Sequence, residues 1–212
     1  MCKALIAAAC LMFAGMTPLA AQPFEFLDWG IQGGINAGYV DYAGAPPWLD
    51  PGWGIGYTIG PFAEFSLTES VRLQSGLRFD HFKNHSDVDR SYGGGGWGEI
   101  VLDCVSLPML AKVAIVRERR LFLVAGPELE YVRQAESRQK IGGRESSGDM
   151  WDEVNRLNLA LDAGLGAEFR AGGHAIFIQG MYCHGLTNVS KRGSWLADWQ
   201  TREIAVTVGL MF

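Results

Sequence analysis

Hydrophobic and polar residues alternate along eight consecutive segments of the chain. The last segment, EIAVTVGLMF, shows the pattern most clearly, because Ile204, Val206, Val208, Leu210 and Phe212 share one face while smaller or polar residues occupy the other. A period of two with β-branched residues indicates a β-strand. The segments span residues 28–42, 54–67, 71–82, 99–115, 121–132, 156–169, 175–186 and 203–212. The pattern therefore predicts an all-β protein.

The connections between these segments alternate in length. They are short after the second, fourth and sixth segments (TES, VRERR and RAGGH) and long after the others. Long connections are unusual in a compact soluble domain, whereas short periplasmic turns and long surface loops are typical of outer-membrane barrels. An even number of strands also brings both ends of the barrel sequence to the short-turn side. We therefore predict an eight-stranded antiparallel up-and-down transmembrane β-barrel.

The face opposite the apolar one carries charges of both signs in the middle of the strands. The interior of such a small barrel is just wide enough for side chains to fill, and buried charges are costly unless they are paired. We therefore expect the apolar face to contact lipid and the charges to pair inside the barrel. This predicted lumen charge network consists of Glu64, Arg72, Arg78, Lys112, Glu128, Glu130, Asp162 and Glu168.

A secreted lipocalin-like barrel is the alternative fold, because it also has up-and-down strands that close into a barrel. It would bury the apolar face and expose the polar one. The aromatic residue at the end of the last strand, Phe212, and the alternating loop lengths favour the transmembrane barrel.

Residues 1–21 resemble a secretory signal peptide, with Lys3 before an apolar run that is too short to span a bilayer comfortably. We expect cleavage after Ala21, which leaves residues 22–212 as the outer-membrane β-barrel domain. Processing as a lipoprotein at Cys10 is the alternative. A signal peptide followed by a transmembrane barrel predicts the outer membrane of a Gram-negative-type bacterium.

The charge balance and the cysteines exclude some functions. The chain has a net charge of −5, which becomes −6 without Lys3 and weighs against a nucleic-acid partner. Cys104 and Cys183 remain after signal removal, and their spacing matches no metal motif. We expect two unpaired interior thiols on strands that are not neighbours, with a disulfide in an oxidising compartment as the alternative.

One group of residues near the predicted outer rim has the residue types of a hydrolase. It consists of His184, Thr187 and Ser190 in the stretch HGLTNVS. A hydrolase of membrane lipid would need a histidine, a nearby serine and an acid that face the lipid, and the spacing does not resemble the His-x-Ser pattern of lipid A deacylases. We therefore predict no enzyme activity and no catalytic residue.

Two further stretches have a superficial resemblance to ligand sites. His81 and His85, with Asp87 and Asp89, resemble a metal-binding set, but a solvated loop explains them more simply. The stretch GGGGWG, residues 93–98, lacks the Lys and Ser or Thr of a phosphate-binding loop and is interpreted as a flexible loop tip. We predict no metal and no cofactor.

The long connections contain many tryptophans, which favour contact with a partner or a glycan when they are exposed. Packing against one another or against lipid headgroups is the alternative. The candidate loop-interaction residues are Trp48, Trp97, Trp151, Trp195 and Trp199.

Several short stretches occur in a fixed order over most of residues 30–212: GGINAGY, GIGYTIGPFAEFSLTESVRLQSGLRF, VSLPMLAKV, LFLVAGPELEYV, LDAGLGAEF and MYCHGLTNV. They resemble the PorT-like outer-membrane β-barrel family, whose members are also labelled porin-family proteins. The chain departs from that family at Ser106, where the family has Glu, and at Met181, near which the family has Arg. The resemblance implies that an interior ion pair is replaced by neutral packing, and it supplies no catalytic residue.

The C-terminal strand also resembles the outer-membrane insertion signal, a terminal Phe preceded by apolar residues at alternate positions. This resemblance implies that Phe212 is read by the barrel-assembly machinery, which makes that machinery and outer-membrane lipid the expected partners. No extracellular partner is identified by the sequence.

We predict an integral outer-membrane β-barrel protein with a filled interior. Its expected role is structural or one of surface interaction, rather than that of a wide pore, because so few strands leave almost no lumen. The alternatives are a secretion-complex component resembling PorT, a surface adhesin that uses its Trp-rich loops, and a secreted lipocalin-like ligand-binding barrel.

Overall fold

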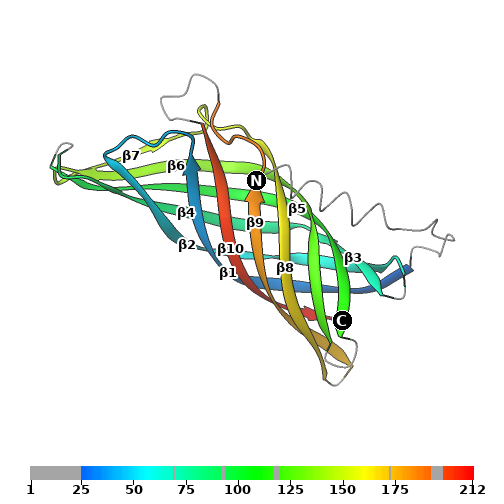
Figure 1. The fold of residues 1–212 in the computed structure, drawn as a ribbon. Coiled ribbons are helices and arrows are strands. Elements are labelled where there is room, and N and C mark those ends of the chain that lie inside the picture. The colour runs from blue at the N-terminus through cyan, green and yellow to red at the C-terminus, as the bar shows by residue number, and fades with distance from the viewer. Residues whose placement is uncertain (1–24, 69, 92–93, 117–119, 172, 192–197) are drawn as a thin grey trace.

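The computed structural model describes a single β-sheet that closes on itself (Figure 1). The signal-peptide prediction for residues 1–21 and the prediction for Trp195 lie outside the described residues. The structure describes residues 25–68, 70–91, 94–116, 120–171, 173–191 and 198–212.

The described residues form ten strands, and no helix among them is long and apolar enough to cross a membrane. The strands are β1 (Glu25–Tyr42), β2 (Leu49–Ser66), β3 (Val71–Gly76), β4 (Arg78–Val88), β5 (Gly96–Val116), β6 (Leu121–Ile141), β7 (Arg144–Asp149), β8 (Leu157–Ala171), β9 (His174–Gly185) and β10 (Trp199–Met211).

The barrel wall is a ring of eight antiparallel strands. β3 and β4 are two parts of one wall strand, separated at Leu77, and both parts pair with β2 and β5. β7 extends β6 as a hairpin and adds nothing to the ring. The ring closes where β10 pairs with β1, from Gly30↔Met211 to Tyr42↔Trp199. The predicted fold class is therefore confirmed.

Several strands are longer than the sequence pattern predicts. β2 begins at Leu49, β4 continues to Val88 and β6 continues to Ile141, so much of the predicted long connections is strand. The alternation of apolar and polar residues stops where a strand leaves the membrane, because both of its faces then meet water, whereas the backbone ladder continues. The predicted solvated loop around His81 and His85 is therefore β4, and Trp97 of the predicted flexible tip belongs to β5.

The two ends of the barrel differ in their connections. The short connections after β2, β5 and β8 all lie at one end, which we call the periplasmic end because short turns face the periplasm in outer-membrane barrels. The final residue lies at this end too, where the Phe212 amide donates to the Trp29 carbonyl at 2.9 Å. The opposite end is called extracellular.

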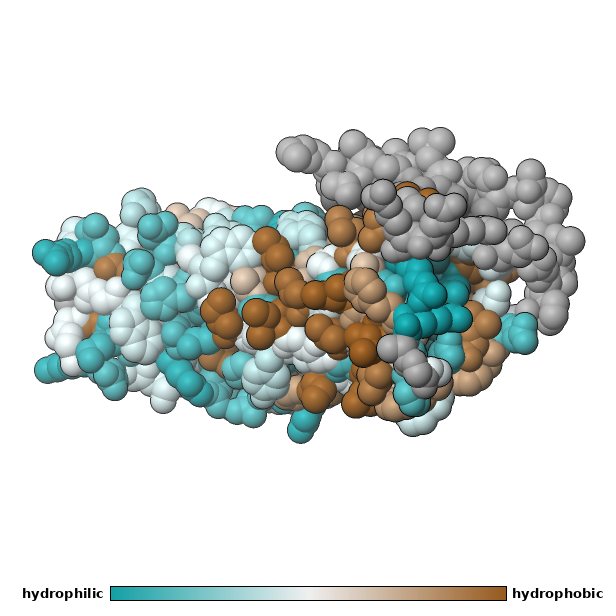
Figure 2. All heavy atoms as spheres, turned by 90° about the horizontal axis from the view of Figure 1, so that it is seen from below, coloured by the Kyte–Doolittle hydropathy of each residue, from teal (hydrophilic) through white to brown (hydrophobic). Residues whose placement is uncertain are grey.

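Large apolar side chains cover the outside of the wall. Ile35, Ile55 and Leu165 are 63%, 69% and 64% exposed, and hydrophobic residues gather across the middle of the molecule in Figure 2. Aromatic rings mark the periplasmic margin of this surface, where Trp29 and Phe212 have ring centroids 5.1 Å apart. Such a band with aromatic margins is typical of a barrel embedded in lipid, and it places the apolar face outside, contrary to the lipocalin-like alternative.

The interior contains apolar layers as well as charged ones. From the periplasmic end, the buried inward residues of β5 include Lys112, Leu110, Ser106 and Leu102. The lower apolar cluster consists of Phe62, Leu110, Phe122, Val124, Ala175, Phe177, Met181 and Met211. The upper apolar cluster consists of Val40, Phe82, Ile100, Leu102, Cys104, Val132, Ala135, Met150, Val154, Val189 and Trp199.

Glycine makes room for the largest rings of the lower apolar cluster. A Cβ at Gly209 would collide with the ring of Phe177, and a Cβ at Gly166 would collide with the ring of Phe122. The missing side chains on β8 and β10 therefore create the space that phenylalanines from β6 and β9 fill.

Candidate functional site

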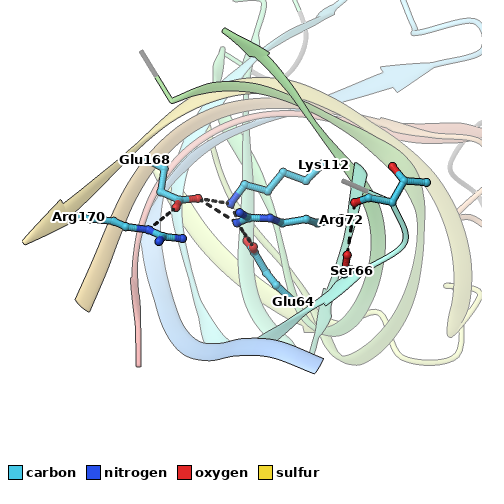
Figure 3. Close-up of polar contacts among 7 residues, drawn as sticks. Glu64, Ser66, Arg72, Lys112, Glu168 and Arg170 are labelled. Carbon is cyan, nitrogen blue, oxygen red and sulfur yellow. Dashed lines mark hydrogen bonds and ion pairs between the residues drawn. The ribbon is translucent and has the colours of Figure 1, made fainter. Parts of the chain in front are cut away.

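The charged layer nearest the periplasmic end, called the mouth layer, gathers side chains from four strands (Figure 3). Each of these residues occupies an inward position of the period-two alternation, so strand pairing alone brings them to the same depth of the barrel. The mouth layer consists of Glu64 from β2, Arg72 from β3, Lys112 from β5, and Glu168 and Arg170 from β8.

Lys112 is the centre of the mouth layer. Its Nζ donates to Glu64 Oε1 at 2.6 Å and to Glu168 Oε2 at 3.2 Å. Arg72 Nη1 donates to Glu64 Oε2 at 3.2 Å. The Lys112 ammonium lies 4.3 Å from the centroid of the Phe122 ring, so a cation–π contact joins the charged layer to the lower apolar cluster.

A second charged layer, called the central layer, lies between the two apolar clusters. Arg78 Nη2 donates to both carboxylate oxygens of Glu128 at 2.7 Å, and Arg78 Nε donates to Asp80 Oδ1 at 2.8 Å. The Ser106 hydroxyl donates to Asp80 Oδ2 at 2.5 Å. Position 106 therefore contributes a hydrogen bond to the ion-pair layer, whereas the resemblance implied neutral packing there.

All of the residues predicted for the lumen charge network lie inside the barrel, but in two layers rather than in one network. Glu64, Arg72, Lys112 and Glu168 belong to the mouth layer, and Arg78, Glu128, Glu130 and Asp162 belong to the central layer. Neither Glu130 nor Asp162 makes an ion pair with a cation in the described part of the chain, so pairing is incomplete.

Sequence reasoning did not assign four polar residues to this site: the buried Asp80, Ser106 and Glu203, and the exposed Arg170. The alternation already places Asp80 and Glu203 on the inward face of their strands, and that signal was sufficient to find them. The contact of Ser106 with Asp80 depends on the register between β4 and β5, which the sequence does not give.

One group in the central layer has the residue types of a metal site. Ligand atoms of Glu128, Asp162 and Cys183 all lie within 4.8 Å of one another. Both oxygens of Glu128 already accept from the guanidinium of Arg78, so this carboxylate is already paired with a fixed cation. We assign no metal to this group, and Cys104 and Cys183 are free and buried, as the sequence predicts.

The cavities of the described structure differ in volume along the barrel axis. At the periplasmic end, a cavity of about 320 Å³ is lined by mouth-layer side chains, including Arg72, Lys112 and Glu168. In the central layer, the cavity beside Arg78 and Glu203 has only about 10 Å³, which is close to the minimum volume for one water molecule. The layers therefore leave no wide aqueous path along the axis.

A third cavity lies outside the membrane at the extracellular end. β6 and β7 form a ladder from Glu136↔Asp149 to Ile141↔Arg144, and the same stretch of β6 pairs with β5 on its other edge (Figure 1). A groove of about 610 Å³ on this ladder is lined by Arg133, Arg138 and Trp151, among others. Hydrogen bonds from Arg138 and Gln134 lower the pKa of the Glu136 carboxyl below its usual value.

The tryptophans predicted to form a loop surface have different environments. Trp151 lines the groove, and the Arg156 guanidinium lies 4.0 Å from the centroid of its ring. Trp97 stacks on His85, with centroids 6.2 Å apart, and Trp48 is partly buried. The prediction for Trp199 is wrong, because this side chain is 1% exposed and packs in the upper apolar cluster.

The stretch HGLTNVS does not bring His184, Thr187 and Ser190 into a catalytic arrangement. The Ser190 hydroxyl donates to Asn188 Oδ1 at 3.0 Å, and the Thr187 hydroxyl donates to Asn158 Oδ1 at 3.3 Å. His184 Nδ1 instead lies 3.3 Å from the Tyr182 hydroxyl. The histidine therefore orients neither hydroxyl.

A protein-family model described as "Outer membrane protein beta-barrel domain" matches residues 20–191 of the sequence. The chain belongs to this family. As an outer membrane β-barrel domain protein, it is located in the outer membrane of a Gram-negative bacterium. A comparison with curated proteins finds no match.

Among solved structures, this outer membrane β-barrel protein is similar to three proteins at the level of fold. Ail, the attachment invasion locus protein of Yersinia pestis, has 15% identity over 89% of this chain and 99% of its own, with a TM-score of 0.46. OprG from Pseudomonas aeruginosa has 11% identity over 87% of this chain and 95% of its own, with a TM-score of 0.45. Neisserial surface protein A has 11% identity over 87% of this chain and 97% of its own, with a TM-score of 0.43.

Proposed function

We propose that this outer membrane β-barrel protein is a closed, non-conducting barrel that acts at the cell surface through its extracellular ladder. The observation that carries the proposal is the sequence of layers inside the wall. The charged mouth layer, the lower apolar cluster, the charged central layer and the upper apolar cluster follow one another along the axis. An ion that crossed this interior would have to displace packed rings and fixed ion pairs.

The lower apolar cluster supports the closed state most directly. Phe62, Phe122 and Phe177 come from three different strands, and their rings meet edge to face, with the centroids of Phe62 and Phe177 5.3 Å apart and those of Phe122 and Phe177 6.4 Å apart. Phe177 is fully buried. Aromatic contacts of this kind add about 0.5–1.5 kcal/mol each to the gain from burial, which favours a permanently filled section.

The extracellular groove supports a surface role. Its arginines and Trp151 are the residue types that carry most of the binding energy at protein interfaces. The ladder lies beyond the membrane band and is held by its own cross-strand pairs, such as Lys140 Nζ to Glu145 Oε1 at 2.8 Å. The groove is therefore presented to the extracellular medium on a regular scaffold rather than on a loose loop.

The proposal keeps the partners that the sequence suggests. Outer-membrane lipid contacts the outward apolar face, the barrel-assembly machinery reads Phe212, and no catalytic step is included. The more specific PorT-like assignment rests on the sequence stretches alone. We do not extend the proposal to a secretion complex, because no contact among the described residues favours it.

Conductance in planar lipid bilayers tests the closed barrel. We expect no discrete channels from the purified protein and measurable openings from a Phe62→Ala/Phe122→Ala/Phe177→Ala variant, which removes the rings of the lower apolar cluster. The Phe26→Ala variant is the control, because Phe26 faces outward and is 54% exposed. Stable channels in the unmodified protein would contradict the proposal.

Binding of whole cells tests the surface role. Cells that display the protein are applied to arrays of glycans and matrix proteins, and the Trp151→Ala and Arg138→Ala variants are compared with the parent. We expect both variants to lose binding. Trp53→Ala is the matched control, because Trp53 is exposed on the wall beside Tyr39, with ring centroids 5.4 Å apart, and lines no part of the groove. Equal binding by the parent, the two groove variants and the control would contradict the proposed surface role.

A further inference from the structure

The mouth layer contains more positive than negative charge. The cavity at the periplasmic end is lined by Arg72, Lys112, Arg120 and Arg170, whereas Glu168 is the carboxylate among its lining residues. Glu64 adds a second carboxylate through its contacts with Arg72 and Lys112. Among the described residues of this site, four cations therefore face two anions.

The two carboxylates are already shared between cations. Glu64 accepts from Lys112 at 2.6 Å and from Arg72 at 3.2 Å. Glu168 Oε2 lies 3.2 Å from Lys112 and 3.5 Å from Arg72, and its Oε1 lies 3.6 Å from Arg170. These distances are longer than the roughly 2.7–2.9 Å of a strong charge-assisted hydrogen bond.

Many donors therefore remain available to a ligand. A guanidinium has five N–H donors in a planar fork. Arg72 uses only Nη1 in its ion pairs, Arg170 uses only Nε, and the Arg120 side chain pairs with no carboxylate in the described part of the chain. Planar forks of this kind bind carboxylate and phosphate groups with two parallel hydrogen bonds.

The backbone holds Arg120 at the rim of the cavity in an unfavourable conformation. Its φ is +52°, the left-handed region that residues other than glycine rarely adopt. The Arg120 carbonyl accepts from the Glu168 amide at 3.0 Å, which fixes this residue next to β8. Sparsely populated backbone conformations concentrate at ligand sites, and an arginine here keeps its guanidinium at the cavity.

The cavity has the size of a small-molecule site. Its volume of about 320 Å³ is much larger than one water molecule and falls at the lower end of the range of ligand pockets. Its floor is Phe122 of the lower apolar cluster, and it opens toward the periplasm. A ligand can therefore enter from that side without crossing the barrel.

We infer that the mouth cavity binds an oxyanion, the carboxylate or phosphate group of a molecule that reaches the barrel from the periplasmic side. Arg72, Arg120 and Arg170 donate to the anion, and Lys112 stays with Glu64 and Glu168 as the fixed base of the site. This binding site is independent of the extracellular groove and of the closed interior.

Calorimetric titration with inorganic phosphate tests the inference. The protein is placed in nanodiscs of phosphatidylcholine at low salt, because salt screens such contacts. We expect saturable binding of one phosphate per barrel. The Arg120→Gly and Arg170→Gln variants are expected to bind at least about tenfold more weakly (about 1.4 kcal/mol). Arg144→Gln is the control, because Arg144 lies on the extracellular hairpin.

The Arg120→Gly variant separates a binding role from a structural one. Glycine adopts positive φ without strain, so the variant is expected to fold at least as well as the parent, which the faster migration of the unboiled barrel in SDS gels would show. Weaker phosphate binding by a well-folded variant supports the inference. Unchanged binding in both arginine variants, or no saturable binding by the parent, would overturn it.

Lipid composition distinguishes two sources of the anion. The titration is repeated in nanodiscs that contain phosphatidylglycerol. If phosphatidylglycerol weakens phosphate binding by the parent but not by the Arg120→Gly variant, the occupant is a lipid headgroup. Unchanged binding there would identify a soluble periplasmic molecule, and either result supports the oxyanion site.

Discussion

Arg78 Nη2 donates to both carboxylate oxygens of Glu128 at 2.7 Å, and the two side chains are 5% and 0% exposed. Arg78 lies on β4 and Glu128 on β6, with β5 between them in the wall. The pair therefore spans β5 on the inner face of the wall instead of bridging neighbouring strands. It fixes the distance between two wall strands that share no backbone hydrogen bond.

Replacing Arg78 by Met should destabilise the barrel strongly. The change leaves Glu128 and Asp80 buried without their cation, and breaking one side of a buried pair costs about 3–5 kcal/mol. The free energy of unfolding, measured in urea with lipid vesicles, should fall by that amount. The exposed Arg144→Met change on the hairpin should alter it by no more than about 0.5 kcal/mol. Equal effects of the two changes would show that the central layer does not stabilise the fold.

Adding a single methyl group at Gly209 should also destabilise the barrel. A Cβ there would collide with the ring of Phe177, and overpacking of this kind costs about 1–3 kcal/mol. Gly180→Ala is the matched control on the neighbouring strand, because nothing lies within 4 Å of a Cβ at Gly180. The same unfolding measurement compares the two variants. Tolerance of Gly209→Ala would mean that the lower apolar cluster can repack.

Phe212→Ala should reduce the amount of folded barrel in the outer membrane. The Phe212 ring meets Trp29 at the periplasmic margin and is 44% exposed, so its removal exposes little core, while the predicted insertion signal is lost. The fraction of heat-modifiable protein in the outer-membrane pellet measures the effect. Phe169→Ala is the control, because Phe169 also faces outward and is 59% exposed. Similar losses from both variants would argue against a specific signal.

The extracellular ladder should loosen in acid. The hydrogen bond from Lys140 lowers the pKa of the Glu145 carboxyl, and that from Arg138 lowers the pKa of Glu136. Both pKa values lie below the ordinary 4.5. Arg138 and Glu136 are neighbours on β6, so only the Lys140–Glu145 pair joins β6 to β7. That pair contributes stability above pH 4.5 and loses it as the pH falls through the lowered pKa of Glu145.

Cross-strand NMR contacts between β6 and β7 should therefore be present at pH 6 and weaken only once the pH falls below the ordinary carboxyl pKa of 4.5. High salt should weaken them at pH 6 as well, since exposed pairs are screened. The Glu136→Gln/Glu145→Gln variant should show little pH dependence over this range. A ladder that keeps its contacts in acid would mean that backbone hydrogen bonds alone hold it.

The sequence alone predicted the fold class of this outer membrane β-barrel protein. Alternation in eight segments identified the wall strands, and the short and long connections gave the up-and-down order. The inward position of each predicted network residue followed from period two, because successive side chains of a strand point to opposite faces.

Several features were not predictable because they depend on register and on neighbours across the sheet. Trp199 follows a polar connection and resembled an exposed loop residue, yet strand pairing with β1 brings it into the upper apolar cluster. The ladder of β6 and β7 carries no apolar alternation, because both of its faces meet water. These residues are identified as strands only by their backbone pairing.

The division of the interior into layers is likewise a tertiary property. Alternation predicts that Lys112 and Arg78 point inward. The depth of each side chain along the barrel axis, however, depends on the tilt and stagger of the strands. That stagger places Lys112 with Glu64 and Glu168, and Arg78 with Glu128. Alternation therefore shows which side chains face inward, and closure of the barrel sets which of them meet, because contacts inside the barrel join residues that no local pattern relates.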